Sequence, residues 1–166
     1  ALDLNRADEA ARYALRADRL KGIDPRQLRK LGIDLSDNGD WQGAVELYEK
    51  ALSLRKEAQP SATDVLLHME IGRLRHLLND YKNAAQDFAL VVDSLEHPKK
   101  YRLDKDVVDL LLQKAGPTYA LMAECFLLAD RLDQAAAAFE KSHKASPDKA
   151  RQGYDLARLK ARREQP

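Results

Sequence analysis

The chain has 166 residues, of which 45% are apolar and 33% charged, with only seven glycines and six prolines. This length suits one compact domain or a short repeat array, and the composition excludes a disordered or collagen-like chain and favours a soluble helical protein. The formal net charge is +1, and arginines gather near both ends, at 12–21 and 158–163. Basic faces of that size are usually ordinary solvated surface, so we expect no nucleic-acid partner.

A single cysteine, Cys125, rules out an intramolecular disulfide framework and lies in an apolar run, where we expect a buried thiol. The longest apolar segment, residues 118–129, is interrupted by Glu124 and is too short to span a bilayer. We therefore expect no membrane insertion and a soluble protein, cytoplasmic by default. The compartment itself stays unknown, because the chain begins without Met and a removed export signal is compatible with the sequence.

The first complete pattern is a pair of helices over about 25–58. Small and apolar residues recur at helical spacing on two segments: Leu28, Leu31, Gly32 and Leu35 on the first, and Ala44, Leu47, Tyr48, Ala51 and Leu52 on the second. Gly39 is expected to end the first helix and Asp40 to cap the second, which predicts an antiparallel hairpin. We interpret Gly32 and Ala44 as small residues where the two helices cross, and Tyr48 as filling the gap toward the following unit.

The same scheme returns twice, over about 65–98 and 116–149. The second unit carries Ile71, Gly72, Ala84 and Phe88, and the third carries Met122, Ala123, Ala135 and Phe139, with Pro147 after its end. Half units continue the pattern over about 1–24, with Ala10, Ala14, Ala17 and Leu20, and over 150–166, with Leu156 and Ala157. We therefore expect one repeat domain over 1–166, with three full hairpins and a half unit at each end, that is a piece of a longer protein.

The longer spacing between the second and third hairpins indicates an insertion at about 99–115. Asp104 can cap a short helix over 104–115, which Gly116 and Pro117 would end. Its apolar side chains face one way: Val107, Val108, Leu111 and Leu112. Such a stripe has to be buried, either on the outer surface of the array or across its mouth.

These units resemble the tetratricopeptide repeat family, whose 34-residue hairpin has Leu-Gly on its first helix and Ala followed four residues later by an aromatic on its second. The first element stands here as Leu31-Gly32, Ile71-Gly72 and Met122-Ala123, and the second as Ala44 with Tyr48, Ala84 with Phe88, and Ala135 with Phe139. The leading aromatic of the family is kept only by Tyr119, while Leu28, His68 and Arg75 replace aromatics elsewhere. The resemblance implies an all-α fold, a right-handed superhelical array of antiparallel helix hairpins, here with one inserted helix.

In arrays of this kind the first helices line a concave groove that receives an extended peptide or a partner helix. The residues expected to point into it are Arg26, Arg29, Ile33, Ser36, Leu66, Met69, Arg73, His76, Ala120, Glu124, Leu127, Tyr154 and Arg158. The groove would be basic at both ends and apolar in the middle, which favours a protein or peptide partner that is acidic and has an apolar anchor. The same residues also fit an ordinary solvated helix face. A clamp for a C-terminal carboxylate, which some family members have, is disfavoured because Ile33, Glu70 and Leu121 stand at its places.

We predict no catalytic, cofactor or metal site. The four histidines, His68, His76, His97 and His143, lack the spacing of metal ligands, and no glycine-rich phosphate loop occurs in the sequence. Carboxylates such as Glu46, Glu49, Asp87 and Asp93 are expected on exposed helix faces, in pairs with Lys or Arg.

The sequence therefore predicts a protein that is not an enzyme, a protein–protein interaction module or scaffold. Two alternatives stay open. The array could be the substrate-presenting or regulatory arm of a larger enzyme, or a self-assembly element whose inserted helix docks on a neighbouring copy. The oligomeric state and the identity of the partner do not follow from the sequence.

Overall fold

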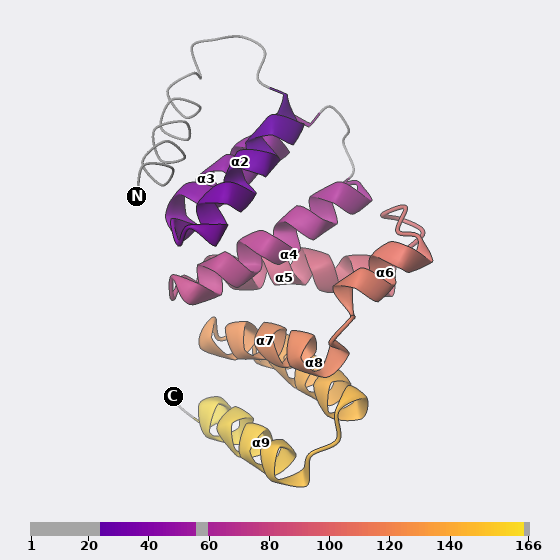
Figure 1. Cartoon of the computed structure of the whole chain (residues 1–166). Coiled ribbons are helices and arrows are strands. Elements are labelled where there is room, and N and C mark those ends of the chain that lie inside the picture. The colour runs from indigo at the N-terminus through magenta and orange to yellow at the C-terminus, as the bar shows by residue number, and fades with distance from the viewer. Residues whose placement is uncertain (1–23, 56–59, 165–166) are drawn as a thin grey trace.

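The computed structural model describes residues 24–55 and 60–164, and this part of the chain is all-helical (Figure 1). Its eight helices are α2 (Pro25–Asp37), α3 (Trp41–Ser53), α4 (Ala62–Leu77), α5 (Tyr81–Glu96), α6 (Lys105–Leu111), α7 (Ala115–Leu128), α8 (Leu132–Ala145) and α9 (Lys149–Arg163). The half unit predicted over 1–24 lies, up to residue 23, outside the described residues. Within the described ranges, no helix combines the length and the apolar character that crossing a membrane requires.

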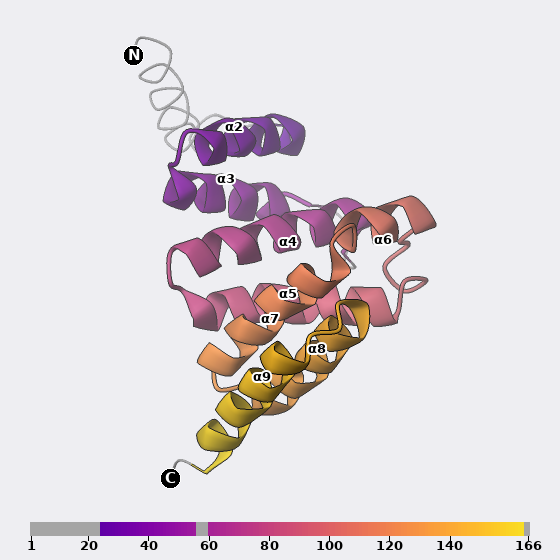
Figure 2. The ribbon, with the colours of Figure 1, turned by 60° about the horizontal axis from the view of Figure 1, so that its bottom comes forward.

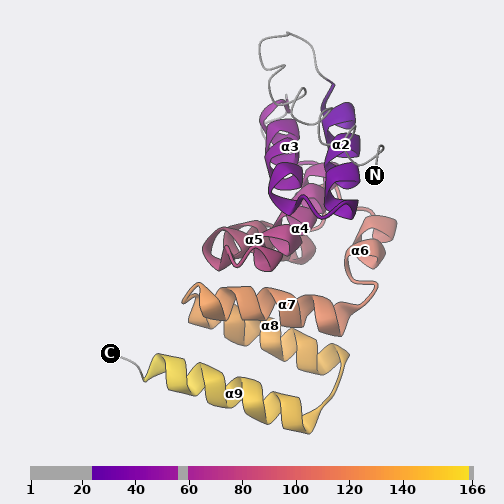
Figure 3. The same ribbon diagram turned by 60° about the vertical axis from the view of Figure 1, so that its left-hand side comes forward.

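The helices pack as consecutive pairs. α2 packs on α3, α4 on α5, and α7 on α8, and successive pairs then meet through α3 and α4, α5 and α7, and α8 and α9. Figures 1 and 2 show these pairs following one another along the molecule. Figure 3 shows α6 beside α4, on the side of α4 away from α5. Each pair therefore contacts mainly its neighbours in the sequence.

One turn geometry closes all three pairs. Gly39, Asn79 and Asp130 occupy the same place in their turns, with positive φ angles of 84°, 60° and 62°. In each turn the next residue donates its backbone N–H to a carbonyl five residues earlier: Asp40 to Leu35 at 2.9 Å, Asp80 to Arg75 at 2.8 Å, and Arg131 to Phe126 at 2.8 Å. This is a helix-ending motif that glycine favours and that Asn and Asp tolerate. The predicted ending at Gly39 and the predicted cap at Asp40, which accepts from the N–H of Gly43 at 2.9 Å, are confirmed.

The aromatic side chains of the second helices cover the small residues of the first helices. A Cβ atom added at Gly72 would lie 2.7 Å from Cε1 of Phe88, and one added at Gly32 would lie 2.7 Å from Cδ1 of Tyr48. The need for a small residue at Gly32 and at Gly72 is therefore confirmed. The ring of Tyr48 packs on Gly32 of its own pair, and Tyr48 also belongs to a core cluster that contains Leu67, Ile71 and Leu74 of the following unit.

The inserted helix is shorter than predicted. α6 covers Lys105–Leu111, and the Asp104 carboxylate caps it by accepting from the N–H of Val107 at 2.9 Å. Gly116 and Pro117 do not end this helix but lie in the first turn of α7. Proline is tolerated there because the first N–H groups of a helix have no intrahelical acceptor.

A buried carboxylate and its arginine partner join three helices. Asp87 of α5, predicted on an exposed face, is buried, accepts from Nη1 of Arg75 at 2.5 Å and lies 2.8 Å from Nδ1 of His68. Arg75 of α4 also pairs with Glu49 of α3. His68 and Arg75, two of the residues that replace family aromatics, are thus partners of one carboxylate that the sequence pattern placed on the surface.

Candidate functional site

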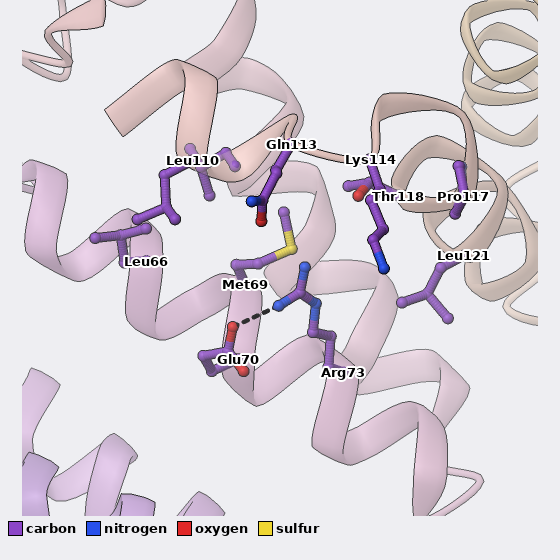
Figure 4. Close-up of a pocket in the computed structure, with 11 residues that line it drawn as sticks. Leu66, Met69, Glu70, Arg73, Leu110, Gln113, Lys114, Pro117, Thr118 and Leu121 are labelled. Carbon is purple, nitrogen blue, oxygen red and sulfur yellow. Dashed lines mark hydrogen bonds and ion pairs between the residues drawn. The ribbon is translucent and has the colours of Figure 1, made fainter. Parts of the chain in front are cut away.

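A pocket of about 540 Å³ opens between α4, α6 and α7 (Figure 4). It is lined by Leu66, Met69, Glu70, Arg73, Leu110, Leu111, Gln113, Lys114, Pro117, Thr118 and Leu121. Three predicted groove residues, Leu66, Met69 and Arg73, are among them. The pocket therefore lies on the side of the first helices α4 and α7, with α6 as an added wall.

Helix α4 supplies one wall of the pocket with one of its faces, and another face packs into the core. A capping box starts the helix, in which the backbone N–H of Ser61 donates to Asp64 Oδ2 at 2.8 Å and that of Asp64 donates to Ser61 Oγ at 3.3 Å. From that fixed start, Leu67, Ile71 and Leu74 enter the core cluster shared with α2 and α3. The pocket residues follow on another face: Leu66, Met69, Glu70 and Arg73. This spacing of three and four residues makes one continuous helical surface.

The opposite walls come from α6 and the start of α7. Leu111 of α6 is buried in the core and Val107 packs against it, so the short helix is held in place by its apolar stripe. Its neighbour Leu110 is 58% exposed at the pocket. The side chains of Pro117 and Leu121 line the α7 side. Of the predicted stripe, Leu111 is buried, and Val107, Val108 and Leu112 are half-buried.

The charged side chains that line the pocket are two basic ones, Arg73 and Lys114, and one acidic one, Glu70. Arg73 Nη1 lies 2.6 Å from Glu70 Oε1, and both side chains are partly exposed. Lys114 is exposed, and no carboxylate of the described residues pairs with it. Figure 4 shows Arg73 and Lys114 both reaching into the space between α4 and α7. The pocket thus combines an apolar floor with an amine that pairs with no carboxylate of residues 24–55 and 60–164, an arrangement that can hold an apolar group next to an anion.

The other predicted groove residues lie outside this pocket. On α2, Arg26 and Ile33 are exposed, Ser36 is half-buried, and Arg29 is half-buried with no hydrogen bond at Nε. His76 contacts the ring of Tyr81 edge-on, with the centroids 5.7 Å apart.

Toward the C-terminal end, predicted groove residues pair with each other. Arg158 of α9 donates to both carboxylate oxygens of Glu124 on α7, at 2.6 and 2.7 Å. The guanidinium of Arg158 also lies 5.4 Å from the ring centroid of Tyr154, which is exposed. Ala120 and Leu127 are buried. At this end of the predicted groove, the positive charge of Arg158 is therefore paired with Glu124.

A second, smaller pocket of about 300 Å³ lies among α5, α7 and α8. Lys141 lines it, pairs with Glu96 at 2.5 Å, and lies 5.6 Å above the ring centroid of Tyr119. Its cation already has a carboxylate and an aromatic face, so it offers less to an anionic ligand than Lys114 does.

Among the described residues, Cys125 and Asp93 have pKa values that are shifted by burial and by hydrogen bonds. Burial, with a smaller effect of Glu124, raises the pKa of the Cys125 thiol to about 12, which disfavours the thiolate that nucleophilic chemistry needs. Hydrogen bonds from Lys100 and Tyr101 lower the pKa of Asp93 to about 2, so this carboxylate is a poor proton donor. Across the described ranges, no group of three or more His, Cys, Asp or Glu residues is placed to hold a metal ion.

In comparisons with known proteins, no family model, no curated protein sequence and no solved structure matches this chain.

Sequence reasoning missed most of the walls contributed by α6 and α7. Leu110, Gln113 and Lys114 belong to the insertion, where no repeat position assigns a direction to a side chain. The apolar stripe of the insertion indicated that this segment packs against another part of the chain. It did not indicate which helix the segment packs against. The sequence pattern assigns Glu70 no place in the groove, and the structure places it beside Arg73 in the pocket.

Proposed function

We propose that the chain is a tetratricopeptide-like, right-handed superhelical array that acts as a non-catalytic protein-interaction module. The repeated crossing of small and aromatic residues and the identical turns of the three pairs support this architecture. Its binding site is the groove along the first helices, centred on the pocket between α4, α6 and α7. Its ligand is a peptide segment with one large apolar side chain next to an acidic residue.

The observation that carries this proposal is the apolar floor next to the amine of Lys114, for which the described part of the chain supplies no carboxylate. Leu66, Leu110 and Leu121 offer apolar surface to a side chain that leaves water, at roughly 25 cal/mol per Å² buried. An adjacent carboxylate of the ligand would meet Lys114 and the outer side of Arg73. Exposed charges of this kind act mainly on the association rate and on specificity, and the apolar anchor supplies most of the affinity.

A peptide selection followed by binding measurements tests the proposal. Random peptides displayed on phage are selected on the full chain, and enriched sequences are expected to carry a large apolar residue beside Asp or Glu. Synthetic peptides are then titrated against Leu110→Asp and Lys114→Glu, which change exposed positions. Each variant is expected to weaken binding about tenfold, which corresponds to about 1.4 kcal/mol.

Lys82→Glu is the matched control, because it makes the same charge change at an exposed position of α5 away from the pocket. It is expected to bind like the wild type. Enrichment of peptides without acidic residues, or equal binding by Lys114→Glu and the wild type, would refute the assigned site.

A further inference from the structure

Thr118 is a buried polar residue in the wall of the pocket between α4, α6 and α7. It is 8% exposed and lines the pocket within the first turns of α7. No group of residues 24–55 and 60–164 forms a hydrogen bond with its hydroxyl. Burying a hydroxyl without a hydrogen bond is unfavourable, because the group gives up contact with water and gains no other partner. Its presence in the wall therefore needs an explanation other than the stability of the fold.

An apolar residue occupies the equivalent position of α4. By the repeat pattern, Thr118 corresponds to Leu67, which is 6% exposed and belongs to the core cluster shared with α2 and α3. Valine has the shape of threonine without the hydroxyl, so packing alone would be served equally well by an apolar side chain at 118. The hydroxyl is thus available to a group that enters the pocket.

The amine of Lys114 lies one helical turn before this hydroxyl. The backbone N–H of Thr118 donates to the carbonyl of Lys114 at 2.9 Å, so the two side chains share one face at the start of α7. Both line the pocket, and Figure 4 shows them beside each other at the α7 wall. Helix α7 also begins without a side-chain cap. An amine, a hydroxyl and the start of a helix all favour a ligand atom that accepts hydrogen bonds and carries negative charge.

The charges of the pocket limit which anion fits there. Arg73 is already engaged by Glu70, with 2.6 Å between Nη1 and Oε1. Lys114 pairs with no carboxylate of the described residues, so one positive charge is left for a ligand. A carboxylate supplies one negative charge, whereas a phosphoryl group carries about −1.5 to −2. The excess charge of a phosphoryl group would lie uncompensated close to Glu70.

We propose that Lys114 and Thr118 bind a single carboxylate of the peptide ligand, with one oxygen accepting from the Thr118 hydroxyl and the other facing the Lys114 amine. This inference rests on the proposed function and places its acidic residue: the side chain of Asp or Glu enters the pocket at the α7 wall. The adjacent apolar side chain of the ligand covers Leu66 and Leu110. Thr118 then determines specificity, because a ligand with an apolar group in this place leaves the hydroxyl without a partner.

Three short peptides serve as probes. Each is an acetylated tetrapeptide amide with alanine at both ends and leucine at the second position, and the third position is aspartate, alanine or phosphoserine. They are titrated into the isotope-labelled full chain, and binding is followed by backbone amide NMR shifts. The aspartate peptide is expected to give saturable shifts at Lys114 and Thr118 and to bind about tenfold more tightly than the alanine peptide. The phosphoserine peptide is expected to bind more weakly than the aspartate peptide.

Thr118→Val removes the hydroxyl and keeps the shape of the side chain. It is expected to weaken binding of the aspartate peptide about tenfold and to leave binding of the alanine peptide unchanged. Thr63→Val is the matched control, because it makes the same change at an exposed position of α4 that does not line the pocket, and it should bind like the wild type. Neither hydroxyl forms a hydrogen bond within the described residues, so both variants should unfold at no lower urea concentration than the wild type.

Equal binding of the aspartate peptide by Thr118→Val and the wild type would overturn this inference. If Lys114→Glu still weakens binding in that case, the proposed function is kept; if it does not, the proposed function fails as well. Absence of saturable shifts with the aspartate peptide, or tighter binding of the phosphoserine peptide, would also overturn the inference. A loss of stability in Thr118→Val would count against it too, because the hydroxyl would then have a structural role.

Discussion

The packing of Phe88 on Gly72 predicts that the same glycine-to-alanine substitution stabilises the chain at one helical position and not at another. A Cβ added at Gly72 would lie 2.7 Å from Cε1 and 2.9 Å from Cδ1 of Phe88, whose ring is fully buried and has little room to move. Gly153 of α9 is also inside a helix, but a Cβ added there meets nothing within 4 Å. Alanine is favoured over glycine within a helix by about 1 kcal/mol at both sites.

We therefore expect Gly153→Ala to raise the free energy of unfolding by about 1 kcal/mol. At Gly72 an overpacking cost of about 1–3 kcal/mol opposes the same gain, so Gly72→Ala is expected to leave stability unchanged or to lower it by up to about 2 kcal/mol. Urea unfolding followed by circular dichroism measures both values. In a Phe88→Leu background the penalty of Gly72→Ala should shrink by about 1 kcal/mol or more. If Gly72→Ala stabilises the wild-type chain as much as Gly153→Ala does, the proposed packing is refuted.

Three further predictions concern charged and buried groups. Arg75→Met should lower the free energy of unfolding by about 2–4 kcal/mol because it leaves buried Asp87 with fewer partners. The side chain of Arg73 is 42% exposed and that of Arg75 is 16% exposed, so Arg73→Met should lower the free energy of unfolding by at most about 1 kcal/mol. Equal losses for the two variants in urea unfolding would contradict this. Cys125 should stay unreactive toward a thiol reagent at pH 8 until the chain unfolds, since its pKa is raised to about 12, and rapid native labelling would contradict its burial. Burial raises the pKa of Asp155 in the folded chain, so protonation favours folding below its ordinary value near 3.8, and that benefit is lost as the pH rises through the folded pKa. Asp155→Asn should therefore be more stable than the wild type at pH 8, with a smaller difference at pH 4, and a difference independent of pH would show that this carboxylate does not carry the effect.

The helices and their order could be predicted because each pair repeats a pattern with a direct physical cause. The small residues at 32 and 72 and the aromatics at 48 and 88 are adjacent in space, so their spacing in sequence reflects real contacts. The cap at Asp40 and the stop at Pro147 follow from local backbone chemistry, with α8 ending at Ala145.

The burial of Asp87 could not be read from the sequence in the same way. Its partners His68 and Arg75 lie on another helix, 19 and 12 residues away, and neither spacing is a helical period. The candidate pocket was missed for a related reason. The pocket depends on how α6 packs against α4. A seven-residue helix between two repeats has no repeat register from which its direction could be predicted.

The three identical turns also bear on the order in which the chain folds. Each pair is joined by only three residues, at 38–40, 78–80 and 129–131, so its helices meet through contacts that are local in sequence and form rapidly. The connections between pairs differ: the 8 residues 54–61 separate α3 from α4, whereas the 18 residues 97–114 separate α5 from α7. By the flexible-chain estimate, closing the longer connection costs about 0.7 kcal/mol more in loop entropy. Folding should therefore start within single pairs and join the first two before the third, so that the wall formed by α6 and α7 is completed last.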